Sequence, residues 1–246
     1  MADRFYFDGD WRDVAAKGVV NLTGSEAHHL SKVLRKKVDD LVELFDGRGQ
    51  QATAKLIRVG KRDADLELLN APQPCVKKLP RVTLAVAPPK GDRFRWLIEK
   101  ATEIGVAHFI PLRTERSVVL PGGTKLEKLH QTMIAACKQS GRDQFMEIAA
   151  PIDLQHLPES LSGNDQLYYG DVPREDIVTS LNDKNSDENG VVVVIGPEGG
   201  LTEAEIDQLR EWGGQPLSVS PHVLRIETAA IAVASLLVSS FLLRSD

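Results

Sequence analysis

The stretch VVVVIGPEGGLTEAEIDQL, residues 191–209, sets an apolar run directly before a Gly-Pro-Glu-Gly-Gly tip. Four valines and an isoleucine predict a strand that is buried on both faces. Thr202 and Glu205 have the spacing of a capping box, which predicts that a helix begins just after the glycines. Strand, tip and helix in this order place the glycines at the sheet edge where open α/β proteins bind ligands.

The tip does not carry the usual phosphate-binding motifs. It matches neither GxGxxG nor GxxxxGK followed by Ser or Thr. Pro197 also lacks a backbone donor, and Glu198 would repel a pyrophosphate. The tip therefore favours an uncharged or cationic ligand, and the alternative is that the glycines only form a tight turn.

Strands and helices alternate after residue 81, which predicts an α/β domain with a mostly parallel sheet. Strands are expected at residues 81–88, 108–112, 165–170, 191–195 and 216–220, and a polar loop at residues 182–190. Helices are expected at residues 94–105, 125–139, from 202 onward, and at 229–243. In the helix of residues 94–105 the apolar side chains share one face, and Gly105 is the expected stop.

The first part of the chain has a different pattern. Short alternating runs at residues 40–47, 51–60 and 63–70 predict a small β-barrel. One helix is expected among them, capped by Ser25, with Leu30, Val33, Leu34 and Val38 on its apolar face. The proline-rich stretch at residues 70–81 predicts a linker. The expected domains are residues 1–73 and 74–246.

Charge is distributed unevenly along the 246 residues. Residues 77–142 carry 13 Lys and Arg against 5 Asp and Glu, whereas residues 143–246 carry 5 against 18. An anionic partner is therefore expected to meet the middle of the chain, despite a net charge of −5.

Cysteines and apolar stretches exclude several other classes. Cys75 and Cys137 give neither a disulfide framework nor a zinc site, and the N-terminus does not resemble a secretory signal, so a cytoplasmic location is expected. The apolar residues 229–243 are fewer than the roughly 20 that span a bilayer. They predict a buried helix, covered by the rest of the fold or by a second subunit.

Linked motifs along the whole chain resemble one family. KGDRFRWLIEKATEIGVAHFIPLRTERSVV, AACKQSGR, IGPEGGLTEAEI and LSVSPHVLRIETA follow HHLSKVLRKKVDD in this order. They resemble the RsmE family of 16S rRNA (uracil-N3) methyltransferases, within the SPOUT superfamily. In the last motif Ser220, His222 and Ile226 stand where Gly, Arg and Thr are typical, whereas Arg225 is retained.

The resemblance implies a PUA-like β-barrel followed by a SPOUT-type α/β domain with a trefoil knot that binds S-adenosylmethionine. It implies a homodimer, which would cover the apolar final helix, and no metal. The residues expected to bind the cofactor are Tyr169, Gly170, Ile195, Gly196, Pro197, Glu198, Gly199, Gly200, Leu217, Val219, Leu224, Arg225 and Thr228.

The implied reaction is methyl transfer to N3 of a uridine in 16S rRNA of the small ribosomal subunit. That nitrogen must lose a proton, so Arg225 is the candidate cation for the developing charge and Glu198 the candidate base. The residues expected to contact RNA are Arg35, Lys36, Arg116, Gln139 and Arg142. Two alternatives are a non-catalytic RNA-binding assembly factor and, disfavoured by the missing fingerprint, a nucleotide-binding oxidoreductase.

Overall fold

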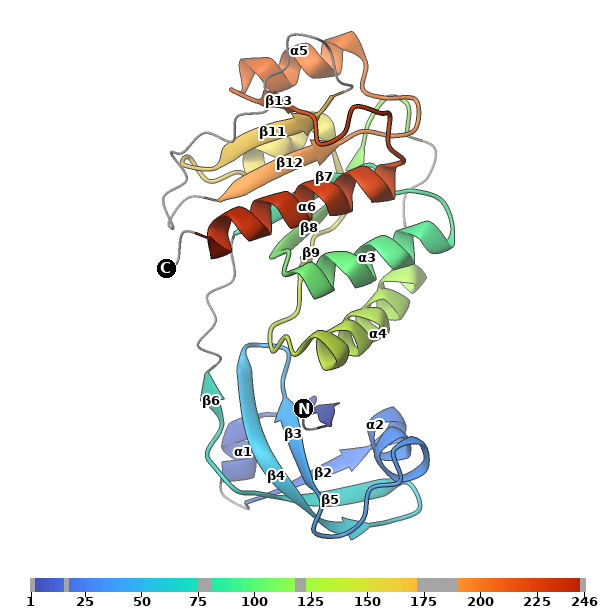
Figure 1. The fold of residues 1–246 in the computed structure, drawn as a ribbon, viewed down its shortest axis with the longest axis vertical. Helices are drawn as coiled ribbons and strands as arrows, with labels where there is room; N and C mark the ends of the chain where they lie inside the picture. Colours follow the sequence, from blue (N-terminus) through green and yellow to red (C-terminus); the bar gives the residue numbers. More distant parts are fainter. Residues whose placement is uncertain (1–2, 16–17, 75–80, 118–122, 172–189, 244–246) are drawn as a thin grey trace. The chain divides into compact units, whose positions relative to one another are not determined.

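The computed structural model describes residues 3–15, 18–74, 81–117, 123–171 and 190–243. Two compact units make up the chain (Figure 1). The first comprises Met1–Lys78 and Ile134–Phe145, and the second comprises Leu79–Met133 and Met146–Asp246. Residues 134–145 thus belong to the first unit although they lie far along the chain, and the boundary between residues 73 and 74 stays a prediction.

The first unit contains a six-stranded sheet in the order β1-β3-β4-β5-β2, with β6 paired to β4. β1 runs parallel to β3, and the other pairs are antiparallel. The strands are β1 (Arg4–Tyr6), β2 (Val19–Thr23), β3 (Leu41–Phe45), β4 (Gln50–Val59), β5 (Asp63–Leu68) and β6 (Gln73–Pro74). The three predicted alternating runs form β3, β4 and β5.

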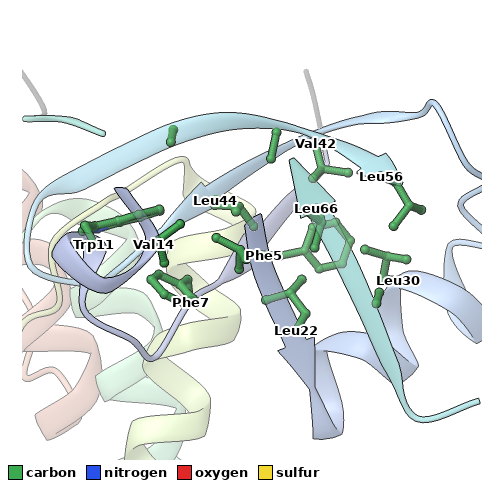
Figure 2. Close-up of a cluster of buried hydrophobic side chains, with 14 residues drawn as sticks. Phe5, Phe7, Trp11, Val14, Leu22, Leu30, Val42, Leu44, Leu56 and Leu66 are labelled. Atoms are coloured by element: carbon green, nitrogen blue, oxygen red, sulfur yellow. The ribbon is translucent and has the colours of Figure 1, made fainter. Parts of the chain in front are cut away.

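One apolar core lies inside this sheet (Figure 2). Val42 and Leu44 of β3 are two residues apart and both fully buried, because side chains on a strand alternate between the two faces. Phe5 of β1 and Leu66 of β5 join them, and Trp11 of helix α1 (Trp11–Ala15) closes one end. The alternation in the sequence is therefore the pattern of a sheet with one buried face.

The predicted helix after residue 25 begins earlier in the chain and is shorter than expected. It consists of α2 (Gly24–His28) and a π-helical turn, η1 (His29–Val33), and its N-cap is Thr23 rather than Ser25. Leu30 is buried, but Val33 is 57% exposed and Val38 lies beyond the helix. The helix ends early because Arg35 adopts a left-handed conformation with φ 53°, and the Lys36 amide donates to the Leu30 carbonyl at 3.0 Å.

Residues 134–145 are tied to the first unit by charged and backbone contacts. The Arg4 guanidinium pairs with the buried Asp143 carboxylate and also donates to the Cys137 carbonyl at 3.1 Å. Lys138 pairs with Glu26 at 2.9 Å. Cys137 is fully buried, as the apolar face of its helix predicts, and burial raises the pKa of its thiol to about 11.

The second unit is built on a seven-stranded parallel sheet in the order β10-β8-β7-β12-β11-β13, with β9 paired to β8. Every residue of the valine strand β12 is buried, as predicted for a central parallel strand. The strands are β7 (Val82–Val86), β8 (His108–Arg113), β9 (Glu147–Ile148), β10 (Ile152–Asp153), β11 (Gln166–Gly170), β12 (Val191–Ile195) and β13 (Gln215–Leu217).

Helices cover this sheet on both faces. α3 (Asp92–Ile104) and α6 (Ile226–Leu242) pack against each other, and α6 also contacts β7 and β12 (Figure 1). α5 (Glu203–Glu211) and the 3₁₀ helix η2 (Leu154–Ser160) pack through Leu209 and Leu157 on a second apolar cluster. α4 (Gly123–Ser140) begins in this unit, and its last residues belong to the first. The predicted α/β class is confirmed, while the trefoil knot stays a prediction.

Helix α6 contains most of the apolar residues 229–243, whose length was compared above with that of a membrane-spanning helix. Ala230, Val233, Ala234 and Leu237 are buried on one side, whereas Leu236 on the other side is 39% exposed in the single chain. Among the described residues, no helix is both long and apolar enough to cross a membrane. The rest of the fold therefore covers one face of α6 and leaves part of the other open.

Candidate functional site

A pocket of about 520 Å³ lies at the carboxyl ends of β11, β12 and β13. The three strands are parallel neighbours, so their carboxyl ends meet at one edge of the sheet. One wall is residues 196–200, here called the glycine loop, and the other is residues 218–225, here called the final loop. This is the position at which open parallel sheets bind ligands.

Backbone conformation explains the glycines of the first wall. Gly200 has φ 71°, a left-handed value that favours glycine, and its amide donates to the Pro197 carbonyl at 2.8 Å to close the turn. A Cβ at Gly196 would lie 2.9 Å from Cγ of Leu201. The missing side chains therefore serve both the tightness of the turn and the close approach of Leu201.

The far end of the glycine loop is fixed by the predicted capping box, which is confirmed. Thr202 accepts from the Glu205 amide, and the Glu205 carboxylate accepts from the Thr202 amide at 2.8 Å. The other oxygen of this buried carboxylate accepts from the Glu115 amide at 2.8 Å. Next to it, Arg116 donates to the Gly199 carbonyl at 2.7 Å. The loop after β8 thus holds the glycine loop from one side.

A second arginine holds the glycine loop from α3. Nη2 of Arg93 lies 3.3 Å from Oε1 of Glu198, and its Nη1 lies 3.8 Å from Oε1 of Glu227. Glu198 stands in the glycine loop, and Glu227 lies in the first turn of α6. One guanidinium therefore links three segments that are far apart in the sequence.

The final loop is held by short-range bonds within itself. Ser218 Oγ donates to the Ser220 carbonyl at 3.2 Å, and the His222 amide donates to Ser220 Oγ at 3.1 Å. Ser220 does not adopt a positive φ, so this position does not require the glycine that the family resemblance would place there. His222 and Val223 line the pocket beside Arg225, and the Val223 side chain is 77% exposed.

Most of the residues predicted to bind the cofactor come together in this pocket. Tyr169 is the first exception, because it is fully buried in the core below the pocket. Thr228 is the second, because it is exposed on α6 and does not line the cavity. The predicted residues that do line it are Gly170, Ile195, Gly196, Pro197, Glu198, Gly199, Gly200, Leu217, Val219, Leu224 and Arg225.

The two candidate catalytic residues lie on opposite walls. Arg225 is the N-cap residue of α6 and is exposed to the pocket, while Glu198 is exposed in the glycine loop. Asp171, which the sequence analysis did not single out, also lines the pocket directly after β11. The pocket thus carries two carboxylates and one arginine beside an imidazole and mostly apolar walls.

The five residues predicted to contact RNA differ in accessibility. Arg35 and Gln139 are exposed in the first unit, but Lys36 is partly buried and paired with Asp3 at 2.6 Å. Arg142 is only 7% exposed, its Nε donates to the Gln144 carbonyl, and burial lowers its pKa. A direct phosphate contact by Arg142 does not fit this burial. The sequence pattern around Arg142 could not show that its guanidinium turns inward.

Two arginines have contacts that the sequence analysis did not indicate. Arg116 is exposed, as a phosphate-binding residue would be, but it also has a structural bond to the glycine loop. Arg93 was not singled out, although one signal was available. It lies in the first turn of α3, where the helix dipole disfavours a cation, so a pair of acidic partners was to be expected. Among the described residues, no group of three or more His, Cys, Asp or Glu is arranged to hold a metal ion.

Known proteins share both units of the chain. The sequence model of a family described as an RNA methyltransferase domain matches residues 77–238, and that of an RNA methyltransferase PUA domain matches residues 22–69. Ribosomal RNA small subunit methyltransferase E from Bacillus subtilis is 30% identical over 257 residues, covering 99% of both chains. The protein of the same name from Synechocystis is 33% identical over 89% of this chain and 73% of its own.

A solved structure agrees with these matches. Ribosomal RNA small subunit methyltransferase E from Neisseria gonorrhoeae, crystallised with S-adenosylmethionine, superposes with a TM-score of 0.84 at 27% identity over 98% of each chain. The two matching domains, an RNA methyltransferase domain and an RNA methyltransferase PUA domain, place the chain in the class of RNA-modifying enzymes. Within that class, the chain belongs to the RNA methyltransferase family that includes the ribosomal RNA small subunit methyltransferase E proteins.

Proposed function

We propose that the protein transfers a methyl group from S-adenosylmethionine to N3 of a uridine in 16S rRNA of the small ribosomal subunit. The observation that carries this proposal is the pocket between the glycine loop and the final loop, at the strand ends of a family member. Relatives named ribosomal RNA small subunit methyltransferase E cover nearly the whole chain, and one was crystallised with S-adenosylmethionine.

The chemistry of the pocket fits S-adenosylmethionine. The donor carries a positive sulfonium and an ammonium group, and Asp171 and Glu198 supply carboxylates of opposite charge. Backbone of the glycine loop and the apolar Leu217 and Leu224 give the surface that an adenosine requires. When bound, the donor supplies an electrophilic methyl group, and the residues of this chain orient both reactants.

Arg225 and Glu198 carry the two roles that the reaction on uracil needs. N3 holds a proton near neutral pH, and its loss leaves negative charge on O2 and O4 of the ring. Arg225, exposed on the final loop side of the pocket, is placed to stabilise that charge. Glu198, on the opposite wall, is the candidate that accepts the proton.

RNA and a second copy of the chain are the proposed partners. Exposed Arg35 and Gln139 in the first unit and Arg116 in the second are suited to backbone contacts with RNA. The open face of α6, with the half-exposed Leu236, supports a homodimer that covers it. The dimer is tested by the mass of the protein in solution, since Leu236→Glu should favour the monomer.

Thermal unfolding tests the cofactor. A ligand at about 100 times its dissociation constant stabilises the folded protein by about 2.7 kcal/mol. For a chain of this size the midpoint should rise by about 5–10 °C. S-adenosylmethionine and S-adenosylhomocysteine should both produce this shift, and NAD should not. A shift with NAD alone would instead support the oxidoreductase.

Methyl transfer to small ribosomal subunits that lack the modification tests the reaction. A methyl group on N3 blocks the pairing edge of uracil, so reverse transcription should stop at one new position. Arg225→Ala should slow transfer by about 100-fold or more, while Arg12→Ala, which removes an exposed cation of the first unit, should not. Binding to RNA without any transfer would leave the assembly factor as the better description.

A further inference from the structure

Arg93 occupies an electrostatically unfavourable position that its two acidic partners offset. It lies two residues after Gly91, the N-cap of α3, where the helix dipole repels a cation. Glu198 approaches its Nη2 at 3.3 Å and Glu227 its Nη1 at 3.8 Å. A cation is placed at this helix start only because the two carboxylates converge on it.

Glu227 adds a second unusual feature to the cluster. The residue is only 8% exposed, and its Oε2 has no hydrogen-bond partner among the described residues. Its Oε1 faces the Arg93 guanidinium, so this arginine is the charged partner of a buried carboxylate. Removing the arginine would leave that carboxylate without its cation, which is costly inside a protein.

The cluster connects directly to the pocket. Glu198 belongs to the glycine loop, and Ile226, the residue before Glu227, lines the same cavity. The opposite side of the loop is held by Arg116 through the Gly199 carbonyl. Arg93 is therefore the second of two arginines that bond to the glycine loop, and it also pairs with Glu227 in the first turn of α6.

We propose that Arg93 is a positioning residue that sets the methyl-donor pocket. By pairing with both Glu198 and Glu227, it keeps the glycine loop in register with the start of α6, so that the two walls of the pocket have a fixed separation. Arg93 does not line the cavity and acts through the loop rather than on the ligand. This inference rests on the proposed function, because it takes the pocket to be the S-adenosylmethionine site.

Two explanations of the cluster predict different ligand behaviour. If Arg93 determines the shape of the pocket, its loss should lower the binding affinities for S-adenosylmethionine and S-adenosylhomocysteine by the same factor. If Arg93 only neutralises charge, its loss should favour the cationic S-adenosylmethionine over the neutral thioether product, because the Glu198 carboxylate would face the sulfonium uncompensated. The ratio of the two affinities therefore separates positioning from simple charge balance.

Calorimetry with Arg93→Ala makes this test. Both ligands should bind about three- to tenfold more weakly, as expected for a partly exposed ion pair, with an unchanged ratio of affinities. Arg93→Lys should recover part of the affinity, since an ammonium can reach one carboxylate. Arg95→Ala is the matched control, because Arg95 is an exposed cation on the same helix, and it should bind both ligands like the wild type.

A double-mutant cycle with Glu198→Ala checks the route of the effect. If Arg93 acts through Glu198, the losses in affinity for S-adenosylhomocysteine should be less than additive. This ligand is used because it lacks the sulfonium that Glu198 itself would face. Additive losses, a changed ratio of the two ligands, or wild-type binding by Arg93→Ala would each overturn the inference. Failure of the wild type to bind either ligand would instead overturn the proposed function.

Discussion

The two walls of the pocket are held in different ways. The glycine loop is bonded by side chains from two other segments, through Arg93 and Arg116. Directly after the loop, Glu205 ties Thr202 to the Glu115 amide. In the final loop, Ser218 and Ser220 make local bonds within the loop itself. Long-range bonds fix the position of a loop relative to the fold, whereas local bonds fix only its shape. We infer that the glycine loop is the preorganised wall of the pocket.

The largest effect is expected where the preorganised wall needs its backbone geometry. Gly200→Val places a β-branched side chain at φ 71°, although nothing lies within 4 Å of its Cβ. The strain of about 3 kcal/mol should deform the loop. The affinity for S-adenosylmethionine, measured by calorimetry, should therefore fall by about 100-fold. Gly163→Val is the control, because that glycine also has open space but no positive φ. Equal affinities in the two variants would show that the loop is not preorganised.

A smaller effect is expected at the anchor of the same wall. Glu205→Ala removes the acceptor of the Thr202 and Glu115 amides from a buried site. The cost should be about 2 kcal/mol, which lowers the unfolding midpoint by about 4–8 °C. Glu203→Ala removes an exposed carboxylate from the same helical turn and should change the midpoint far less. Similar melting of both variants would mean that the capping box does not anchor the loop.

The smallest effect is expected in the final loop. Val223→Ser removes an exposed apolar side chain that lines the pocket, so the midpoint without ligand should stay within about 1 °C. Ligand affinity should still fall by about fivefold, because a bound nucleoside would bury this side chain. Val33→Ser, which changes an exposed valine of the first unit, should leave affinity unchanged. A drop in the midpoint without ligand would show that the final loop is part of the rigid fold.

Local signals in the sequence predicted much of the second unit. The capping box at Thr202, the buried valine strand and the helix stop at Gly105 all depend on neighbours within a few residues, and all three are confirmed. Such features are set by backbone geometry and burial, which the sequence shows directly. The order of strand, tip and helix also placed the glycine tip at the ligand-binding edge of the sheet, whereas the other predicted cofactor residues were implied by the family resemblance.

The errors occurred where the structure depends on distant contacts. The helix after residue 25 was extended to Val38, because the apolar spacing does not reveal that Arg35 takes a left-handed conformation. Arg142 was expected on the surface, although its guanidinium is buried. Arg93 was overlooked because Glu198 is 105 positions away in the chain. A single sequence gives no direct sign of such a pairing.

Arg4 has a consequence for how this protein can be recombined. Its buried guanidinium pairs with Asp143, and Gly47 accepts a hydrogen bond from the Phe145 amide at 2.8 Å. The N-terminal module is thus completed by a segment encoded far downstream. A chimera that exchanges only residues 1–73 with a relative would join Arg4 of one parent to residue 143 of the other. Grafts should therefore carry residues 134–145 together with residues 1–73.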